Sequence, residues 1–378
     1  MTKLGSVCRI RYGKDHKKLS DGSIPVYGSG GIMRHVDKRL SDGPSVLIPR
    51  KGTLSNLFFV DGPFWTVDTL FWTDIDRSKV LPGFLYFALK NKDLASLNIG
   101  TAVPSLSADV LNEVELELPS LAEQAAITNL LGSLDEKIAL NNQLNGYLAD
   151  LVTAASKKLY WEYETNGTYL PADWQWVHIE DIAKLVSRGI TPKYNEHSNE
   201  IVLGQTCIRG NLVLVENGRR HCPKRINEKW LQRGDLLINS TGVGSLGRTA
   251  QVWFDPEKLT VDSHITIVRT SNPEHALYLG FWAFAHERYI EALHTGSTGQ
   301  TELPRDYVKS MSLVLPDAET LDRFNTIAKP AVKAIVSNQA ENKQLSALRD
   351  ALLPKLMSGE IDVSKVDLTQ LNSHLSGC

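Results

Sequence analysis

Two stretches of the chain resemble each other at a fixed distance, and this internal repeat constrains the fold more than any other sequence feature. Residues 106–151 match residues 303–348 at a constant shift of 197 positions. The matched pairs are Leu106/Leu303, Asp109/Asp306, Leu116/Leu313, Leu118/Leu315, Pro119/Pro316, Asn141/Asn338, Asn145/Asn342, Leu148/Leu345 and Leu151/Leu348. Upstream, the shift falls in steps to 194, 190 and 175, as insertions would make it. A period this long predicts two related domains in tandem rather than a solenoid.

A long helical segment is predicted after each copy. Residues 122–161 contain no proline, and their apolar or amide residues recur at alternating intervals of four and three, which is the heptad pattern of a coiled coil. Residues 324–352 repeat the pattern, with Pro330 expected to kink the helix or to end a first short turn. The two stripes share four asparagines: Asn141, Asn145, Asn338 and Asn342. Since buried amides fix register, we predict that the two helices pack antiparallel within the chain. The alternative is two unrelated amphipathic helices whose asparagines face solvent.

Short apolar runs bounded by Gly, Pro and Asp fill the regions between the helices, which is typical of strands. The predicted fold class is therefore α/β (mixed α+β), with two tandem domains, each followed by a long helix, and the two helices forming an antiparallel coiled coil. The expected boundaries are residues 1–118 and 162–315 for the domains, 119–161 and 316–356 for the helices, and 357–378 for a C-terminal tail.

The overall charge excludes a protein that coats nucleic acid by bulk attraction. The 378 residues carry 41 Lys and Arg against 43 Asp and Glu, a formal net charge of −2. The sequence has no apolar run of the ~18–20 residues that a membrane helix needs. Its four cysteines form no CxxC pair, so we expect reduced thiols, no metal site and a cytoplasmic location.

Basic residues nevertheless concentrate in one window of each repeat. Residues 1–60 hold 11 Lys and Arg against 4 Asp and Glu, and residues 205–250 hold 8 against 3. A basic window interspersed with polar side chains is typical of a surface that contacts phosphates and base edges, although ordinary solvated charge is the alternative. The candidate DNA-binding residues of the first repeat are Lys14, Lys17, Lys18, Tyr27, Ser29, Arg34, His35, Arg50, Lys51, Thr53 and Thr101. Those of the second are Lys193, Gln205, Arg209, Arg219, Arg220, Ser240, Thr241, Ser245, Arg248, Ser297, Thr298 and Gln300.

Catalytic motifs are absent from the sequence. It contains no GxxxxGK[ST] phosphate loop, no Asn-Pro-Pro-Tyr or Asp-Pro-Pro-Tyr tetrapeptide and no GxSxG nucleophile elbow. Gly242, Gly244 and Gly247 spell GxGxxG, but the strand-like segment RTAQVWF follows where a dinucleotide site needs a helix. We expect no cofactor in this chain and no catalytic residue. The glycines are better explained as a turn that brings the backbone close to DNA, or as plain turn chemistry.

Five segments resemble a known family. They are LPSLAEQAAITNLLGSLDEKIALNNQLN (118–145), LPADWQWVHIEDIA (170–183), GDLLINSTG (234–242), GSTGQTEL (296–303) and LRDALLPKLMSGEI (348–361). In this order they resemble the specificity subunit of Type I restriction–modification systems. The PxxxEQxxI pattern of Pro119, Glu123, Gln124 and Ile127 is quite specific. The second copy departs from it, because Thr320 and Leu321 replace the Glu and the Gln.

The resemblance implies two target-recognition domains, each reading one half of a bipartite, asymmetric site in double-stranded DNA. It implies that the helices set the gap between the half-sites and dock two modification (methyltransferase) subunits, which restriction (translocase/nuclease) subunits join. S-adenosylmethionine, ATP and Mg²⁺ would then belong to the partner subunits. No membrane partner is expected.

Other readings stay open at this point. The specificity subunit of a related system, which fuses nuclease and methyltransferase in one partner, would look the same. A stand-alone DNA methyltransferase and a coiled-coil scaffold are further alternatives. The recognised bases and the gap length do not follow from the sequence, because base readout depends on the geometry of single side chains.

Overall fold

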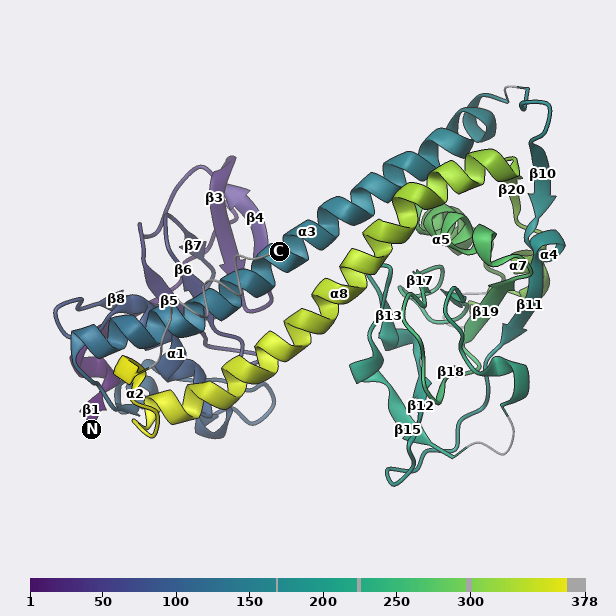
Figure 1. Cartoon of the computed structure of the whole chain (residues 1–378). Helices are drawn as coiled ribbons and strands as arrows, with labels where there is room; N and C mark the ends of the chain where they lie inside the picture. The colour runs from purple at the N-terminus through teal and green to yellow at the C-terminus, as the bar shows by residue number, and fades with distance from the viewer. Residues whose placement is uncertain (168, 223–225, 297–300, 366–378) are drawn as a thin grey trace. The chain divides into compact units, whose positions relative to one another are not determined.

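The computed structural model describes residues 1–167, 169–222, 226–296 and 301–365, and these divide into two compact units (Figure 1). Unit 1 comprises residues 1–140 together with the described residues from 341 onward, and unit 2 comprises residues 141–340. Helix α3 (Leu121–Asn166) begins in unit 1 and ends in unit 2, whereas α8 (Ala318–Met357) begins in unit 2 and ends in unit 1. Each unit therefore contains one half of each long helix.

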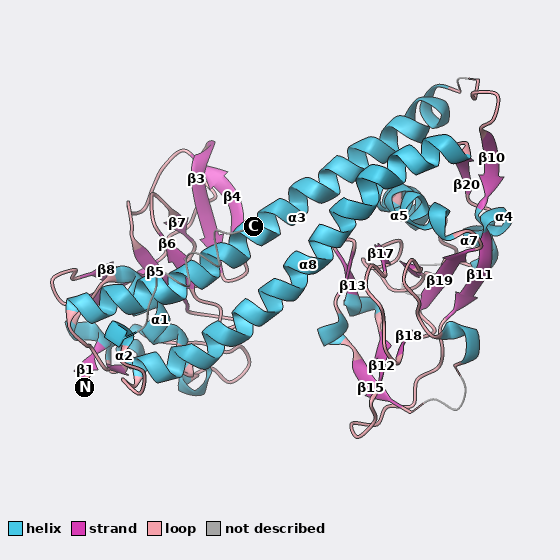
Figure 2. Ribbon diagram, viewed as in Figure 1, coloured by secondary structure: helices cyan, strands magenta, loops and turns pink. Residues whose placement is uncertain are grey.

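Unit 1 is built on two small sheets with short helices beside them (Figure 2). The four-stranded sheet has the order β2 (Cys8–Tyr12), β8 (Leu70–Ile75), β5 (Ser45–Pro49), β6 (Phe58–Val60), and the three-stranded sheet the order β4 (Gly31–Val36), β3 (Asp21–Gly28), β7 (Trp65–Thr66). The remaining elements are β1 (Thr2–Lys3) paired with β9 (Glu115–Leu116), the helices α1 (Pro82–Lys90) and α2 (Ala108–Asn112), and the 3-10 turns η1 (Leu4–Ser6), η2 (Leu94–Leu97) and η7 (Val363–Lys365).

Unit 2 repeats this plan with one additional hairpin. Its four-stranded sheet has the order β11 (Ala183–Arg188), β19 (Ile265–Thr270), β16 (Leu236–Asn239), β17 (Thr249–Gln251), and its three-stranded sheet the order β15 (Arg219–His221), β12 (Glu200–Leu203), β18 (Leu259–Val261). β10 (Gln175–His178) pairs with β20 (Ser312–Leu315), and the added hairpin is β13 (Ile208–Arg209) with β14 (Leu212–Val213). The helices are α4 (Ile179–Ile182), α5 (Ala276–Ala285), α6 (Glu287–Ala292) and α7 (Arg305–Lys309), with 3-10 turns η3 (Gln205–Cys207), η4 (Val215–Asn217), η5 (Asn227–Lys229) and η6 (Pro273–His275).

The two units match strand by strand, which confirms the predicted repeat. In both four-stranded sheets all neighbours are antiparallel, and in both three-stranded sheets one pair is parallel, β3 with β7 and β12 with β18. The strand registers agree as well. Leu47 of β5 lies opposite Trp72 of β8 in unit 1, and Leu237 of β16 lies opposite Ile267 of β19 in unit 2, so β5 matches β16 at a shift of 190 and β8 matches β19 at a shift of 195. The two domains are therefore copies of one fold, and differences between them lie mainly in loops and side chains.

The long helices pair as the asparagine pattern predicts. In unit 2, Asn338 Nδ2 donates to Asn145 Oδ1 over 2.8 Å, and Asn141 is buried. In unit 1, the first half of α3 and the last half of α8 meet in ion pairs of Asp135 with Arg349 at 2.5 Å and of Lys137 with Glu341 at 3.9 Å. Residue numbers rise along one helix as they fall along the other, so the pairing is antiparallel. Pro330 was expected either to kink the helix or to end a first short turn. The second expectation is wrong, because α8 continues through Pro330.

The asymmetry of the PxxxEQxxI pattern has a structural reason. Gln124 is buried in unit 1, where its Oε1 accepts from Leu81 N over 2.9 Å, and its Nε2 donates to the Pro119 carbonyl over 2.9 Å, so it joins α3 to the start of α1. At the equivalent place in unit 2, Leu321 packs in the core, and Asn325, one turn later, donates instead to the Glu274 carbonyl over 2.9 Å. The amide link is thus kept in both units by different residues.

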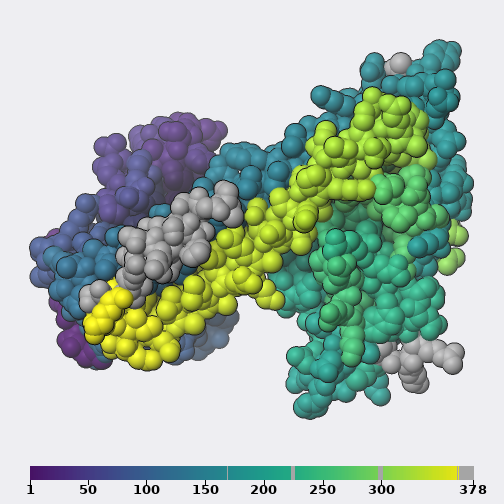
Figure 3. Space-filling view, viewed as in Figure 1, coloured from purple at the N-terminus to yellow at the C-terminus, as the bar shows by residue number. Residues whose placement is uncertain are grey.

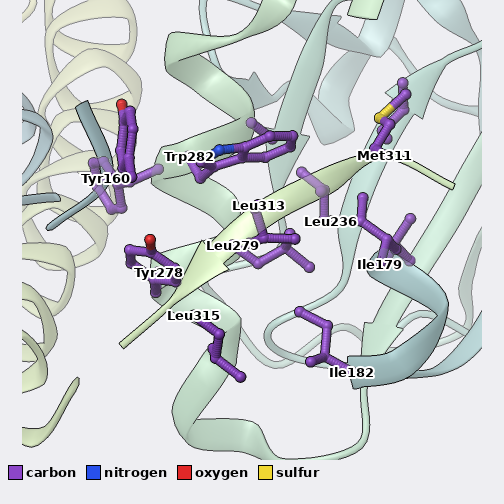
Figure 4. Packing of buried hydrophobic residues seen from close by; sticks show 14 of the residues in the cluster. Tyr160, Ile179, Ile182, Leu236, Tyr278, Leu279, Trp282, Met311, Leu313 and Leu315 are labelled. Carbon is purple, nitrogen blue, oxygen red and sulfur yellow. The ribbon is translucent and has the colours of Figure 1, made fainter. Parts of the chain in front are cut away.

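The core of unit 2 forms where α3, α5, β16 and β20 meet. Figure 4 shows Tyr160 of α3 beside Trp282 of α5, with Leu236, Leu313 and Met311 packed next to them. All five are at most 1% exposed. Glu164, one turn after Tyr160, accepts from Trp282 Nε1 over 2.9 Å. The end of α3 is therefore anchored to its own unit by both apolar packing and a hydrogen bond.

Candidate nucleic-acid interface

One end of the four-stranded sheet of unit 1 is closed by a set of backbone hydrogen bonds, which we call the strand-end frame. Gly13 N donates to the Leu70 carbonyl over 3.1 Å, and Lys14 N donates to the Thr66 carbonyl over 2.8 Å. Leu106 N donates to the Arg50 carbonyl over 2.9 Å, and Lys51 forms an isolated bridge with Ser105. These bonds bring together the loops that follow β2, β5 and α1.

Unit 2 contains the same frame, bond for bond. Gly189 N donates to the Ile265 carbonyl over 3.0 Å, and Ile190 N donates to the Val261 carbonyl over 2.9 Å. Leu303 N donates to the Ser240 carbonyl over 2.8 Å, and Thr241 forms a bridge with Glu302. Even the following turn agrees, because Gly52 and Gly242 have φ values of +94° and +92°, which residues with a Cβ rarely adopt. The frame is therefore a duplicated feature of the fold.

In unit 1 the frame lies against a groove of about 620 Å³. Lys17, Ser29, Met33 and Thr69 are among its lining residues. The backbone amide of Arg50 donates to the Thr69 carbonyl over 2.8 Å, so the basic segment after β5 adjoins the groove. The structure thus brings Lys14, Lys17, Ser29, Arg50 and Lys51, all predicted from sequence, to one place.

The other candidates of unit 1 are more scattered. The Arg34 guanidinium is already engaged, since it donates to Asp21 at 2.5 Å and to the Leu19 carbonyl at 3.2 Å. Tyr27 is half-buried against Phe58, and burial raises the pKa of its hydroxyl. Lys18, His35, Thr53 and Thr101 are exposed.

In unit 2 a polar cluster lies at the frame, where Ile190 and Thr241 take the positions of Lys14 and Lys51. Gln205 Nε2 donates to Thr241 Oγ1 over 2.8 Å and also contacts the Thr241 carbonyl. Thr241 Oγ1 lies 2.8 Å from His264 Nδ1. The Ser245 hydroxyl donates to the Thr241 carbonyl at 3.4 Å, so three of the predicted residues meet here.

The predicted cations of unit 2 lie elsewhere. Arg209 is on β13, whereas Arg219 and Arg220 are on β15, and all three are exposed. Arg219 stacks on the Tyr194 ring, with its guanidinium carbon 3.4 Å from the ring centroid. The expected basic surface of the second repeat is therefore carried by the hairpin and by the smaller sheet. Lys193 is exposed and Arg248 half-buried.

One predicted contact is wrong. Ser240 is completely buried, and its hydroxyl lies 2.7 Å from Thr266 Oγ1 and donates to the Ile238 carbonyl over 3.1 Å. A side chain that is satisfied inside the sheet is not available to DNA. Ser297, Thr298 and Gln300 lie outside the described residues.

Sequence reasoning missed three side chains at the frame of unit 2. Arg188 donates to Glu302 Oε1 over 2.8 Å and to the Leu303 carbonyl over 2.7 Å, and burial lowers the pKa of its guanidinium. Asp262 is 8% exposed, and burial raises the pKa of its carboxyl. His264 is the third. The sequence match concealed its position, because TVDT and TVDS align at a shift of 194. The backbone bonds instead place Val261 at the position of Thr66 and His264 at that of Thr69, a shift of 195.

The GxGxxG segment forms a turn after β16, and strand β17 follows it. This agrees with the expected strand and lacks the helix that a dinucleotide site needs. No cluster of three or more His, Cys, Asp or Glu side chains that could hold a metal ion occurs among the described residues. Over the same residues, no helix is long and apolar enough to cross a membrane.

Comparisons with known proteins agree with the duplicated architecture. Residues 1–148 match the family model of the Type I restriction modification DNA specificity domain. The chain is 23% identical to the Type I restriction enzyme MjaIX specificity subunit of Methanocaldococcus jannaschii over 365 residues, covering 88% of this chain and 81% of that protein. It is 22% identical to the HindI specificity subunit of Haemophilus influenzae, covering 80% of this chain and 83% of that protein.

A solved structure shares the fold. The crystal structure of a Type I restriction–modification S subunit from M. genitalium matches with a TM-score of 0.63 and 16% identity, covering 94% of this chain and 95% of that chain. Residues 1–148 thus carry a Type I restriction modification DNA specificity domain, and the chain is similar over most of its length to specificity subunits of Type I systems.

Proposed function

We propose that each unit of this chain reads one half of a bipartite, asymmetric target in double-stranded DNA. The observation that carries the proposal is the strand-end frame, which has the same backbone bonds in both units and different side chains. A shared frame gives both units the same way of approaching DNA, and different side chains select different bases. Two linked readers also gain specificity, because binding of one half-site raises the effective concentration of the other.

In unit 1 the side chains at the frame favour phosphate contacts combined with base contacts. Lys14, Lys17 and Lys51 are exposed, and Arg50 is held 5.4 Å over the Tyr12 ring. Cations beside a groove attract the DNA backbone, and the nearby hydroxyl of Ser29 and the apolar side chain of Met33 can meet base edges.

We further propose that the helix pair sets the gap between the half-sites and docks two modification subunits. Leu144, Tyr147 and Leu151 on α3 are 47%, 62% and 52% exposed, at the spacing of one helical face. An apolar face of this kind suits a partner helix. In unit 2 the outer side of α8, lime in Figure 3, is also part of the molecular surface.

On this proposal the chain is not itself an enzyme. S-adenosylmethionine, ATP and Mg²⁺ act in the modification and restriction subunits, and this chain chooses where they act in the cytoplasm. Binding of S-adenosylmethionine by the isolated chain would instead favour a stand-alone methyltransferase.

The test is methylome sequencing of the host with and without this gene. The proposal expects a bipartite methylated motif that disappears with the gene. Removing one heptad from each paired helix, within residues 134–151 and the facing part of α8, should then change the gap and leave both half-sites intact. An unchanged gap would contradict the spacer role.

A further inference from the structure

The second repeat has an imidazole where the first has a hydroxyl. Ser240 N donates to the His264 carbonyl over 2.9 Å, as Arg50 N donates to the Thr69 carbonyl over 2.8 Å, so His264 is the equivalent of Thr69. The turn before it agrees, because Ile265 N donates to the Asp262 carbonyl as Leu70 N donates to the Val67 carbonyl. His264 is exposed. Unit 2 therefore presents an exposed imidazole on a backbone that both units share.

The backbone holds His264 firmly at the frame. His264 N donates to Asp262 Oδ1 over 2.9 Å, and Ser240 N donates to the His264 carbonyl over 2.9 Å. Ile265 N closes the turn on the Asp262 carbonyl at 3.2 Å. An exposed side chain on a fixed backbone is pre-organised for recognition, since little of its freedom is left to lose on binding.

A chain of hydrogen bonds runs from Gln205 through Thr241 to the imidazole. The Thr241 carbonyl can only accept, so the Gln205 atom that faces it is the NH₂ group, and this group donates to Thr241 Oγ1 as well. Thr241 Oγ1 lies 2.8 Å from His264 Nδ1, so the Thr241 hydroxyl can donate its own hydrogen to that nitrogen. A neutral imidazole that accepts at Nδ1 carries its proton on Nε2.

We propose that His264 is a specificity-determining residue of unit 2, and that its Nε2–H donates to an acceptor on a base edge. This inference rests on the proposed function of the two units. In the major groove the acceptors are N7 and O6 of guanine, N7 of adenine and O4 of thymine, whereas cytosine presents an amino donor. His264 thus favours a base with an acceptor at one position of the half-site that unit 2 reads, and rejects the cytosine edge there. Thr241 is the positioning residue that acts through His264.

The experiment is methylome sequencing of cells that carry the complete system with single variants of this chain. For His264→Ala, we expect discrimination to fall about tenfold at one position of one half-site. The other half-site and the gap should not change. Thr241→Val keeps the shape but removes the donor to Nδ1, so it should relax the same position to a smaller degree, and Thr241→Ser should restore it.

His197→Ala is the matched control. His197 is also an exposed histidine, but it precedes β12, whereas the cluster residue Gln205 follows the other end of that strand. This variant should leave the motif as it is. An unchanged motif for His264→Ala would overturn the inference. A uniform loss of methylation at every site would also overturn it, because a phosphate contact lowers affinity without altering sequence preference. If the unaltered system produced no bipartite motif, the proposed function itself would fail, which is a different result.

Discussion

The strand-end frames of unit 1 and unit 2 share their backbone and differ in their chemistry. At equivalent positions, unit 1 has Lys14 and Lys51 where unit 2 has Ile190 and Thr241. Unit 1 therefore presents cations beside a groove, and unit 2 presents a hydrogen-bonded polar cluster that includes His264. Duplication preserved the part of the fold that positions loops, and the side chains on those loops diverged. This is the division that two readers of different half-sites require.

The strands beneath the frame differ in the same way. Asp235, which directly precedes β16, is equivalent to Ser45, the first residue of β5, and both are buried. Asp235 binds Arg269 through two contacts of 2.7 Å, whereas the Ser45 hydroxyl donates to the Thr73 carbonyl over 2.8 Å. Unit 2 thus relies on a buried ion pair at a place where unit 1 has a neutral hydrogen bond.

The largest expected effect breaks this buried pair. Asp235→Ala leaves the Arg269 charge buried without its carboxylate, and we expect a loss of about 3–5 kcal/mol in the free energy of unfolding. Ser45→Ala should cost about 1–2 kcal/mol, because only neutral groups lose their partner. Urea titration of the full chain measures both. Equal losses for the two variants would show that the units are stabilised alike at this position.

The helix seam gives the next largest effect. Asn145→Ala leaves the amide of Asn338 without its partner in a half-buried position, which should cost about 1–2 kcal/mol. The double variant Asn145→Leu/Asn338→Leu should recover this loss, because no amide then needs a partner. Asn129→Ala, at an exposed position of the same helix, is the control and should be neutral. If the double variant is no more stable than Asn145→Ala, the amide pair is not the source of the cost.

The smallest expected effect sharpens the contrast between the frames. Lys51→Ala should weaken DNA binding by the assembled complex about three- to tenfold and lower the slope of log affinity against log salt by about one, because one phosphate contact is lost. Thr241→Val should leave the slope unchanged, since no charge is removed. Lys79→Ala, which removes an exposed lysine paired with Asp76, serves as a control for charge alone. A slope that does not respond to Lys51→Ala would remove this residue from the phosphate contacts.

Much of the fold followed from the sequence for an identifiable reason. The repeat shift fixed which strands correspond, and the spacing of Asn145 and Asn338 marked the helix faces that meet. The residues of the candidate DNA interface were harder to predict from the sequence. A basic window does not reveal that Arg34 is already bound to Asp21, or that Ser240 faces the interior of the sheet. His264 carries no motif of its own, and only the backbone bonds show that it stands beside Thr241 at the position of Thr69.

The most direct test of the central claim is methylome sequencing of the complete system with one single variant at the frame of each unit, Ser29→Ala in the groove of unit 1 and Thr241→Val in unit 2. If the two frames read different half-sites, each variant alters base preference in one half only, and the two altered halves are opposite ones. If both variants alter the same half, or if neither changes any base preference, the account of two equivalent reading frames is contradicted.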